Sequence, residues 1–255
     1  MRAASVAAQA GHRVTLLEAT GRLGGQVNLA ECLPGRAEFG GVTTNLVSEL
    51  YQYSVDVRLS NAGSYSILEQ VSADLVILAV GAEPRMPEVD YGEMDVMDSW
   101  AVIAGDKIPG QNVVIADWAC DWSGLGLAQM LAEKGHHVRL AVGASLPGES
   151  IQGIVRDHWI GELHRLGVEV IPFARLYGAD GDTVWFQHQL SAEPIECEAV
   201  DGVVTCYAPR SRKGPDWLQE FDGKVLAVGD ALSPRTVEEA VLEGHRAGMV
   251  AGQEQ

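Results

Sequence analysis

Two acidic residues, Glu18 and Asp230, stand where short apolar runs end. Asp230 follows the run 224–228 and Gly229, and a helix is expected to begin near residues 234–236. In an open α/β sheet, ligands bind at the carboxyl ends of the strands, where a helix N-terminus faces phosphate or a carbonyl oxygen. The pattern predicts a ligand contact at Asp230, and the alternative is an ordinary turn with a solvated carboxylate.

Glu18 ends a helix-then-strand pattern. Residues 1–10 are rich in alanine at helical spacing, Gly11 is suited to end that helix, and residues 13–18 are predicted to form the strand. In a dinucleotide-binding βαβ unit, an acid about 20 residues beyond the G-x-G-x-x-G turn binds the adenosine ribose. Glu18 has a matching place after the helix, but the 255 residues contain no such turn before it.

A glycine-rich segment, residues 21–26, follows Glu18 directly. Gly24 and Gly25 allow a ligand to approach the backbone closely, and Arg22 carries a charge that could meet phosphate. The alternative is a plain surface turn. The acid just upstream favours the interpretation as a binding segment.

These two regions resemble one known family. The run LLEATGRLGGQVNLAECLPGRAEF, residues 16–39, resembles the FAD or ADP segment of the trimethylamine dehydrogenase and 2,4-dienoyl-CoA reductase family. The run GDALSPRTVEEAVLEGHRAG, residues 229–248, resembles the last flavin-binding motif of two-dinucleotide-domain flavoproteins and is most like the amine dehydrogenases and N-demethylases of the family. In that family, an Old-Yellow-Enzyme-type barrel with FMN and an iron–sulfur cluster is followed by two dinucleotide-binding domains.

The resemblance implies a role for each candidate residue. Glu18 would bind the adenosine ribose and Asp230 the ribityl-phosphate end of FAD, with ADP in its place as the alternative. The remaining candidates would line the phosphates and the flavin: Arg22, Gly24, Gly25, Gln26, Gly81, Gly229, Arg235 and Thr236. In particular, the amides near Arg235 and Thr236 would face the flavin or its phosphate.

The implied function is an FAD-binding electron-transfer module of an oxidoreductase that acts on amines, by N-demethylation or deamination, or on enoates. The barrel-type domain with FMN and a 4Fe-4S cluster is absent from the 255 residues. We therefore expect either a piece of a longer chain or a subunit that docks a barrel partner. The alternative is a non-catalytic subunit that binds ADP or another nucleotide, or that docks a partner.

Apolar runs also mark where two domains join. Residues 199–209 mirror residues 74–84, as expected if each domain ends with the same strand-to-linker crossover. Arg85, just after the first crossover, is a candidate flavin neighbour or a solvated loop arginine. The sequence predicts an α/β protein with two Rossmann-like domains of glutathione-reductase type, the second inserted in the first. The predicted domains are an FAD-binding-type domain, residues 1–104 and 223–255, and an NAD(P)-type domain, residues 105–222, with a linker up to residue 110.

The nucleotide motif of the second domain departs from the usual fingerprint. The turn 117–124 lacks glycines where the backbone must approach a pyrophosphate. Trp118 and Trp122 are bulky there, and Asp117 and Asp121 would repel phosphate. We expect no NAD(P) in the usual pose, and the tryptophans to fill a relic site or to pack a partner domain.

Composition excludes several classes of protein. The net charge of −17 disfavours binding to nucleic acid or to anionic lipid, and no apolar run is long enough to span a bilayer. No tyrosine has a lysine four positions later, which disfavours a short-chain dehydrogenase. A homo-oligomer is compatible with the sequence.

No catalytic acid, base or metal cluster is recognisable, so whether the chain is itself an enzyme stays open. The cysteines form no C-x-x-C pair and are expected to be reduced thiols, mostly buried, in a cytoplasmic protein. They are Cys32, Cys120, Cys197 and Cys206.

Overall fold

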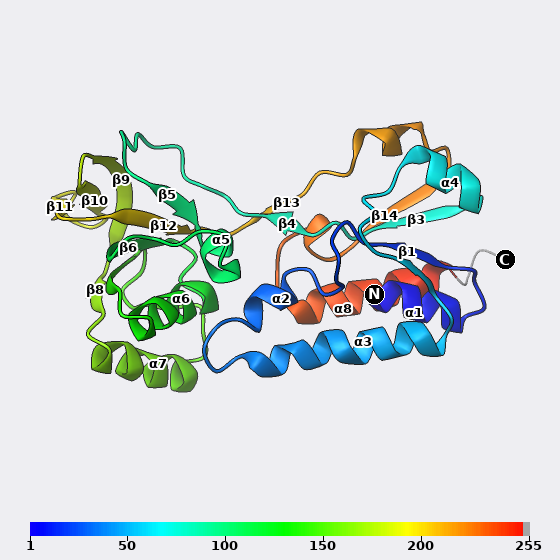
Figure 1. The fold of residues 1–255 in the computed structure, drawn as a ribbon, viewed down its shortest axis with the longest axis horizontal. Coiled ribbons are helices and arrows are strands. Elements are labelled where there is room, and N and C mark those ends of the chain that lie inside the picture. The colour runs from blue at the N-terminus through cyan, green and yellow to red at the C-terminus, as the bar shows by residue number, and fades with distance from the viewer. Residues whose placement is uncertain (252–255) are drawn as a thin grey trace. The chain divides into compact units, whose positions relative to one another are not determined.

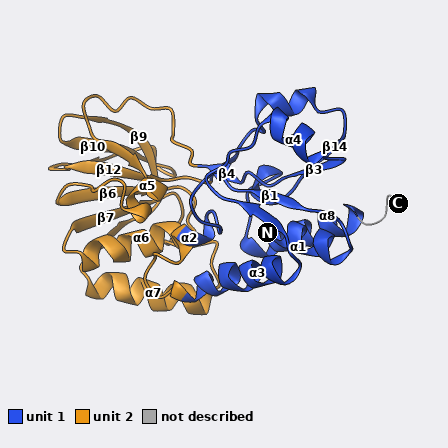
Figure 2. Cartoon of the chain, turned by 45° about the vertical axis from the view of Figure 1, so that its right-hand side comes forward, with its two compact units in different colours: residues 1–28, 38–83, 209–255 blue, residues 29–37, 84–208 orange. Residues whose placement is uncertain are grey.

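The computed structural model describes residues 1–251 of the chain, which form two compact units. Unit 1 comprises Met1–Asn28, Glu38–Glu83 and the chain from Pro209 onward, and unit 2 comprises Leu29–Ala37 and Pro84–Ala208 (Figure 2). The α/β class predicted from the sequence is confirmed. The domain boundaries predicted above stay a prediction.

Unit 1 contains two pairs of parallel strands. β1 (Thr15–Leu17) pairs with β2 (Asp56–Arg58), and β3 (Leu75–Leu78) pairs with β14 (Lys224–Ala227). A short antiparallel pair joins β4 (Ala82–Glu83) to β13 (Arg210–Ser211). The chain enters β14 from far along the sequence, so the last strand and the third lie side by side (Figure 1).

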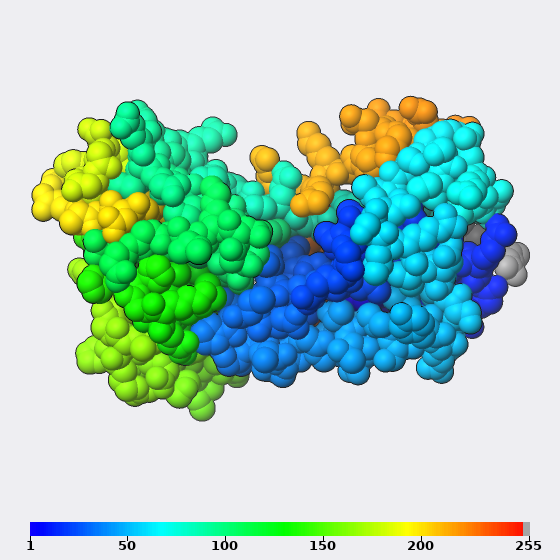
Figure 3. Space-filling model, viewed as in Figure 1, coloured from blue at the N-terminus to red at the C-terminus, as the bar shows by residue number. Residues whose placement is uncertain are grey.

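Three helices of unit 1 pack together: α1 (Arg2–Gln9), α3 (Gly40–Gln52) and α8 (Val237–Ala251). A Cβ atom at Gly248 of α8 would lie 2.7 Å from the carbonyl oxygen of Ala3, so glycine permits the close approach of α8 to α1. On its other side, α1 is held by Glu49 of α3, which accepts hydrogen bonds from Arg2 (2.6 Å) and Ser5 (2.7 Å). The space-filling view shows the atoms of α3 in light blue along one side of the unit (Figure 3).

Short elements complete unit 1. They are α4 (Tyr65–Val71) and the 3-10 helices η1 (Ala37–Phe39), η2 (Asp216–Glu220) and η3 (Gly229–Ala231). The four-residue α2 (Val27–Ala30) follows the glycine-rich segment. The short η1 begins where the boundary between the units lies.

Unit 2 is built on a five-stranded parallel sheet in the order β5-β12-β6-β7-β8. The strands are β5 (Val96–Asp98), β12 (Gly202–Cys206), β6 (Asn112–Asp117), β7 (His137–Val142) and β8 (Glu169–Ile171). A second, antiparallel sheet contains β9 (Ala174–Asp180), β10 (Thr183–His188) and β11 (Pro194–Cys197). The helices are α5 (Ser99–Ala104), α6 (Trp122–Glu133) and α7 (Gly153–Arg165).

The parallel sheet is packed on both faces. On β6, Val113 and Ile115 belong to an apolar cluster with residues of α6, whereas Val114 and Ala116 belong to a cluster with residues of β9 and β10. This alternation is what a strand covered on both sides requires, because successive side chains point to opposite faces. Unit 2 thus has three layers: helices, parallel sheet and antiparallel sheet (Figure 1).

The expected linker contains regular structure. Residues 84–110 were predicted as a connection, but β5 adds a parallel strand beside β12, and α5 follows it at once. Asp98 caps α5 by accepting a hydrogen bond from the N–H of Ala101 (3.0 Å). Within residues 1–251, no helix combines the length and the apolar character that crossing a membrane requires.

Candidate cofactor site

The turn after β14 depends on a glycine. Gly229 is buried and has φ +60°, in the left-handed region that suits glycine. A Cβ atom there would lie 3.3 Å from the Cβ of Ala240 in α8, which is tighter than usual packing. The N–H of Gly229 donates to a carboxylate oxygen of Glu243 (2.8 Å), so α8 holds the turn in place.

Asp230 joins two segments that are far apart in the sequence. Its Oδ2 accepts a hydrogen bond from Nε2 of Gln26 (2.8 Å), and its Oδ1 accepts one from the backbone N–H of Arg235 (3.1 Å). Gly81, at the crossover after β3, lies beside Gln26, since a Cβ atom there would be 3.6 Å from Nε2. Both predicted motifs and the crossover therefore meet at one sheet edge of unit 1.

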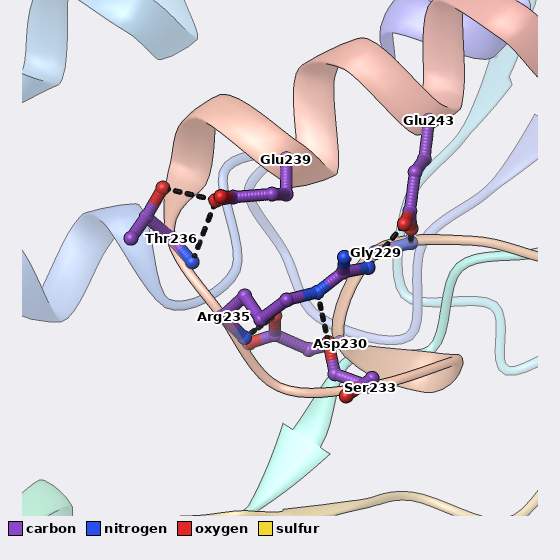
Figure 4. Close-up of polar contacts among 7 residues, drawn as sticks. All are labelled: Gly229, Asp230, Ser233, Arg235, Thr236, Glu239 and Glu243. Carbon is purple, nitrogen blue, oxygen red and sulfur yellow. Dashed lines mark hydrogen bonds and ion pairs between the residues drawn. The ribbon is translucent and has the colours of Figure 1, made fainter.

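The start of α8 forms a capping box (Figure 4). Glu239 accepts hydrogen bonds from the N–H (3.1 Å) and the hydroxyl of Thr236. The hydroxyl bond is the largest cause that holds the pKa of Glu239 below its usual value. The guanidinium of Arg235 pairs with Glu243, and this contact lowers the pKa of that carboxyl.

The capping arrangement bears on two of the predicted contacts. The amides near Arg235 and Thr236 were expected to face a flavin or its phosphate. In the structure, the N–H of Arg235 donates to Asp230 and the N–H of Thr236 donates to Glu239. A ligand that used these amides would have to displace a carboxylate, so their proposed role stays a prediction.

Glu18 and Arg22 form a second cluster in unit 1. A carboxylate oxygen of Glu18 accepts hydrogen bonds from the N–H (2.8 Å) and hydroxyl (2.7 Å) of Thr20, and the same hydroxyl oxygen lies 2.9 Å from the carbonyl oxygen of Arg22. The guanidinium of Arg22 donates to Oδ1 of Asn28 (2.5 Å). Glu18 also stands at the carboxyl end of β1, where its N–H and C=O bond the strand β2 and the loop after it.

The glycines between the two clusters differ in their surroundings. Gly24 has φ +121°, which strains any other residue, and a Cβ atom there would lie 2.5 Å from Oδ1 of Asn28, so a larger residue would also force the Asn28 side chain to move. Gly25 has φ +54°, and no atom of the described chain lies within 4 Å of the position its Cβ would take. The N–H groups of both glycines make no backbone hydrogen bond within residues 1–251. This open, donor-bearing backbone suits a phosphate, and the carboxylates beside it suit hydroxyl groups of a ribose or ribityl chain.

The corresponding turn in unit 2 has a different construction. Asp117, at the end of β6, is 1% exposed; its Oδ1 accepts the N–H of Cys120 (2.9 Å), and its Oδ2 has no hydrogen-bond partner among the described residues. Burial raises the pKa of Asp117 to about 8. The carboxyl occupies the space beside Gly124 in the first turn of α6, where a Cβ would collide with it. Asp121 caps the helix by accepting the N–H of Ser123 (2.7 Å).

Both tryptophans of that turn pack on neighbours within unit 2. Trp118 lies parallel to Tyr207 with ring centroids 6.3 Å apart, and Trp122 meets Trp159 edge-on at 5.0 Å. The guanidinium of Arg36 lies 4.1 Å from the Trp122 ring centroid. The helix N-terminus that would face a pyrophosphate is thus lined by two carboxyl groups and by packed aromatic rings.

Known proteins similar to the chain are oxidoreductases, although no family model matches it. An N,N-dimethylglycine/sarcosine dehydrogenase of Chromohalobacter salexigens is 36% identical over 160 residues, which cover 60% of this chain and 23% of that protein. A bilirubin reductase of Mediterraneibacter gnavus is 33% identical over 252 residues, covering 98% and 39%. A probable N-methylproline demethylase of Rhizobium meliloti is 33% identical over 140 residues, covering 55% and 21%. The chain is homologous to part of these oxidoreductases.

Solved structures agree with this relationship. Histamine dehydrogenase from Rhizobium sp. 4-9 matches with a TM-score of 0.90 at 20% identity, over 100% of this chain and 42% of that one. Thioredoxin reductase of Lactococcus lactis matches with a TM-score of 0.72 at 18% identity, over 98% and 93%. These likenesses show an FAD-type dinucleotide-binding fold. The resemblance inferred from the residues is confirmed, and the chain spans less than half the length of the curated relatives above.

Several residues at the site were not predicted. Glu243 is the most important, because it holds both Gly229 and Arg235. The residues around Glu243 predict only a helix with several acidic side chains, so no local pattern identifies Glu243 as a site residue. The pair Thr236 and Glu239, by contrast, has the T-x-x-E spacing of a capping box and could have been recognised.

Proposed function

We propose that the chain is the flavin-binding, electron-transferring part of an oxidoreductase that acts on amines or enoates. The observation that carries the proposal is the hydrogen bond between Gln26 and Asp230, residues separated by 204 positions. It brings the two segments that resemble flavin-binding motifs to one edge of unit 1. The relatives named as an N,N-dimethylglycine/sarcosine dehydrogenase and a probable N-methylproline demethylase support amines as the substrate class.

The residues divide by the chemistry they offer. Glu18 would accept hydrogen bonds from the adenosine ribose, and Asp230 from the ribityl chain of FAD. Arg22 and the N–H groups of Gly24 and Gly25 would bind the phosphates, because they are cationic or carry unused donors. In this scheme, Gln26 positions Asp230 and is itself a candidate contact to the flavin.

A bound flavin would supply the redox chemistry, and the protein would supply orientation and charge. The chain would hold the cofactor at the edge of unit 1, beside the crossover glycine Gly81 and the turn glycine Gly229. We further propose that the barrel with FMN and a 4Fe-4S cluster is the electron partner, as a domain or a subunit. The cytoplasmic location remains an expectation.

Titration of the chain with FAD tests the proposal. We expect saturable binding of FAD, followed by flavin fluorescence and calorimetry. Glu18→Ala and Asp230→Ala should each weaken it at least about tenfold, because each removes hydrogen bonds to a charged acceptor. Asp216→Ala is the matched control, since Asp216 is an exposed acid of η2 in the same unit. An equal loss in the control, or no saturable binding, would contradict the proposal.

ADP separates the two candidate functions. If FAD is the cofactor, Glu18→Ala should weaken both ligands, whereas Asp230→Ala should weaken FAD alone. If ADP binds as tightly as FAD and Asp230→Ala affects neither, the non-catalytic nucleotide-binding alternative is favoured. The second turn favours this alternative. The carboxyl groups of Asp117 and Asp121 would repel the phosphates of an NAD(P) cofactor, and a non-catalytic subunit needs no such cofactor.

A further inference from the structure

Unit 2 contains a pocket of about 460 Å³ that the proposed function does not use. Its position follows from the sheet topology. β6 and β12 are adjacent parallel strands in the order β5-β12-β6-β7-β8. After β6 the chain continues to β7, on the side away from β12, whereas β5, which precedes β6 in the sequence, lies beyond β12 on the other side. In such sheets, ligands bind outside the carboxyl ends of the strands where the strand order reverses. The pocket lies at that place, because Trp118 and Tyr207 directly follow the two strands and line it.

The register of the sheet fixes an aromatic wall. Asp117 and Cys206 are paired residues at the ends of β6 and β12, so the residues that follow them stand side by side. The N–H of Trp118 donates to the carbonyl of Cys206 (2.9 Å), and its ring lies 11° from parallel to that of Tyr207. The indole packs on Gly143, where a Cβ atom would lie 2.7 Å from the ring, and yet Trp118 is 41% exposed. One part of the ring is therefore held by the protein while another part is accessible.

Two arginines of the same pocket have no ion pair. Unit 2 has six arginines, and four of them contact a partner: Arg36, Arg139, Arg156 and Arg165. Arg85 and Arg175 make no ion pair or side-chain hydrogen bond that involves residues 1–251, although the chain has 35 acidic residues. Both line the pocket, where Glu88 is the one acidic residue among the lining residues. The pocket is therefore locally cationic in a chain of net charge −17.

The antiparallel sheet forms another wall of the pocket. Arg175 of β9 and Gln187 of β10 are directly opposite in register, so they project from the same face. Gln189, just beyond β10, donates to the carbonyl of Gly143 (2.6 Å) and so ties this wall to the backbone beneath Trp118. Burial raises the pKa of Tyr207, and the charges of Arg175 and Arg85, which line the same pocket, oppose that rise.

We propose that this pocket binds a planar aromatic anion, with the ring against Trp118 and Tyr207 and the carboxylate or phosphate at Arg85 and Arg175. A guanidinium binds either anion with paired hydrogen bonds, and aromatic rings stack with ligand rings. The pocket has the volume of a small-molecule site. It differs from a dinucleotide site on the α6 N-terminus, which is lined by Asp117 and Asp121. The proposal does not depend on flavin binding in unit 1.

The test uses two acids and their neutral counterparts: benzoate with benzamide, and adenosine 5′-monophosphate with adenosine. Binding to the full chain is followed by the indole N–H signal of Trp118 in NMR spectra, assigned with Trp118→Phe. We expect at least one acid to shift this signal saturably and to bind at least about tenfold more tightly than its neutral counterpart. Preference for benzoate would identify a carboxylate ligand, and preference for the nucleotide a phosphate ligand.

Variants then test the arginines. Arg85→Gln and Arg175→Gln should each weaken the preferred acid about tenfold or more, because each removes a charge-assisted contact. Arg165→Gln, on the exposed face of α7, is the matched control and should leave the affinity unchanged. The proposal is overturned if neither acid is preferred or moves the Trp118 signal. If the nucleotide is the preferred acid, the proposal is also overturned when inorganic phosphate binds as tightly as the nucleotide. Finally, it is overturned if Arg165→Gln weakens binding as much as the two arginine variants of the pocket do.

Discussion

The strands β6 and β3 are both apolar runs, and yet they are buried to different degrees. Val113, Val114 and Ile115 of β6 are 0% exposed, whereas all four residues of β3 are only half-buried. β6 has a parallel neighbour on each side, β12 and β7. Among the described strands, β3 pairs with β14 alone, and β14 with β3 alone.

The contrast between β6 and β3 shows that a strand gains stability from the neighbours that cover its edges and faces. Both apolar core clusters found among residues 1–251 consist of unit 2 residues. In unit 1, the helices pack closely through small residues, but the strand pairs lack a neighbour on at least one edge. An apolar run therefore indicates a strand, and the number of covered edges and faces decides how much free energy its side chains contribute.

Truncating one isoleucine in each strand should give the largest effect. Ile115→Ala in β6 should cost about 2–5 kcal/mol, because it leaves a cavity in a fully buried layer. Ile77→Ala in β3 should cost about 1–2 kcal/mol, since its side chain already meets solvent. Native-state hydrogen exchange of the amides in each unit measures the two losses separately.

The control for this pair is Ile108→Ala, because Ile108 is 80% exposed and should change stability by less than about 0.5 kcal/mol. Equal losses for Ile77→Ala and Ile115→Ala would show that β3 is as well packed as β6. The comparison between the units would then fail.

The sequence predicts the strands that are recognisable from their own residues and misses those that depend on contacts elsewhere in the fold. The apolar runs predicted β3, β6, β7 and β14, because continuous apolar residues bounded by glycine need no partner to be recognised. β5 and α5 were missed, since the segment 84–110 is rich in prolines and polar residues and its pairing with β12 is set by tertiary contacts. The cap at Asp98 was the one local signal for α5.

The site shows the same limit. The segments of Gln26 and Asp230 were each recognised, but the bond between them joins distant parts of the chain and no spacing predicts it. At the second turn, the aspartates were identified as unsuited to phosphate. What the sequence does not reveal is that Asp117 points into the protein, where Oδ2 has no partner, whereas Asp230 receives two donors.

The two strand-end acids provide the second prediction, on pH. Burial raises the pKa of Asp117 to about 8, from the 3.8 that is ordinary for an aspartate. Between these values, the folded state keeps a proton that the unfolded state releases, so stability falls as pH rises. From pH 5 to pH 8, this group should lower the stability of unit 2 by on the order of 3–4 kcal/mol. Asp117→Asn should remove that slope and raise stability at pH 8.

Urea unfolding, followed by tryptophan fluorescence at pH 5, 6.5 and 8, measures the slope. The groups near Asp117 are Asp121, Tyr207 and the thiols of Cys120 and Cys206, and burial raises the pKa of both thiols out of this range. Asp106→Asn, at an exposed acid of unit 2, should keep the parent slope. A parent slope retained by Asp117→Asn would mean that Asp117 is ionised in the folded chain.

The third prediction concerns the helix caps of the two units, where we expect only minor changes in stability. Thr236→Ala in unit 1 removes the hydroxyl that bonds Glu239 and the N–H of Glu238, and should cost about 1 kcal/mol. Asp98→Ala in unit 2 removes the cap of α5 and should cost a similar amount. The two losses of stability should differ in how far they spread through their units. Ser99, Val102 and Ile103 of α5 are buried, so that loss should appear across unit 2.

The start of α8 is exposed or half-buried, so the loss from Thr236→Ala should stay local. Hydrogen exchange in the first turn of α8 should rise about fivefold, with β14 unchanged. Thr236→Ser keeps the hydroxyl and should stay close to the parent. If Thr236→Ala instead accelerated exchange throughout unit 1, the cap would be coupled to both parallel strand pairs. Unit 1 would then unfold as one cooperative body, as is expected of unit 2.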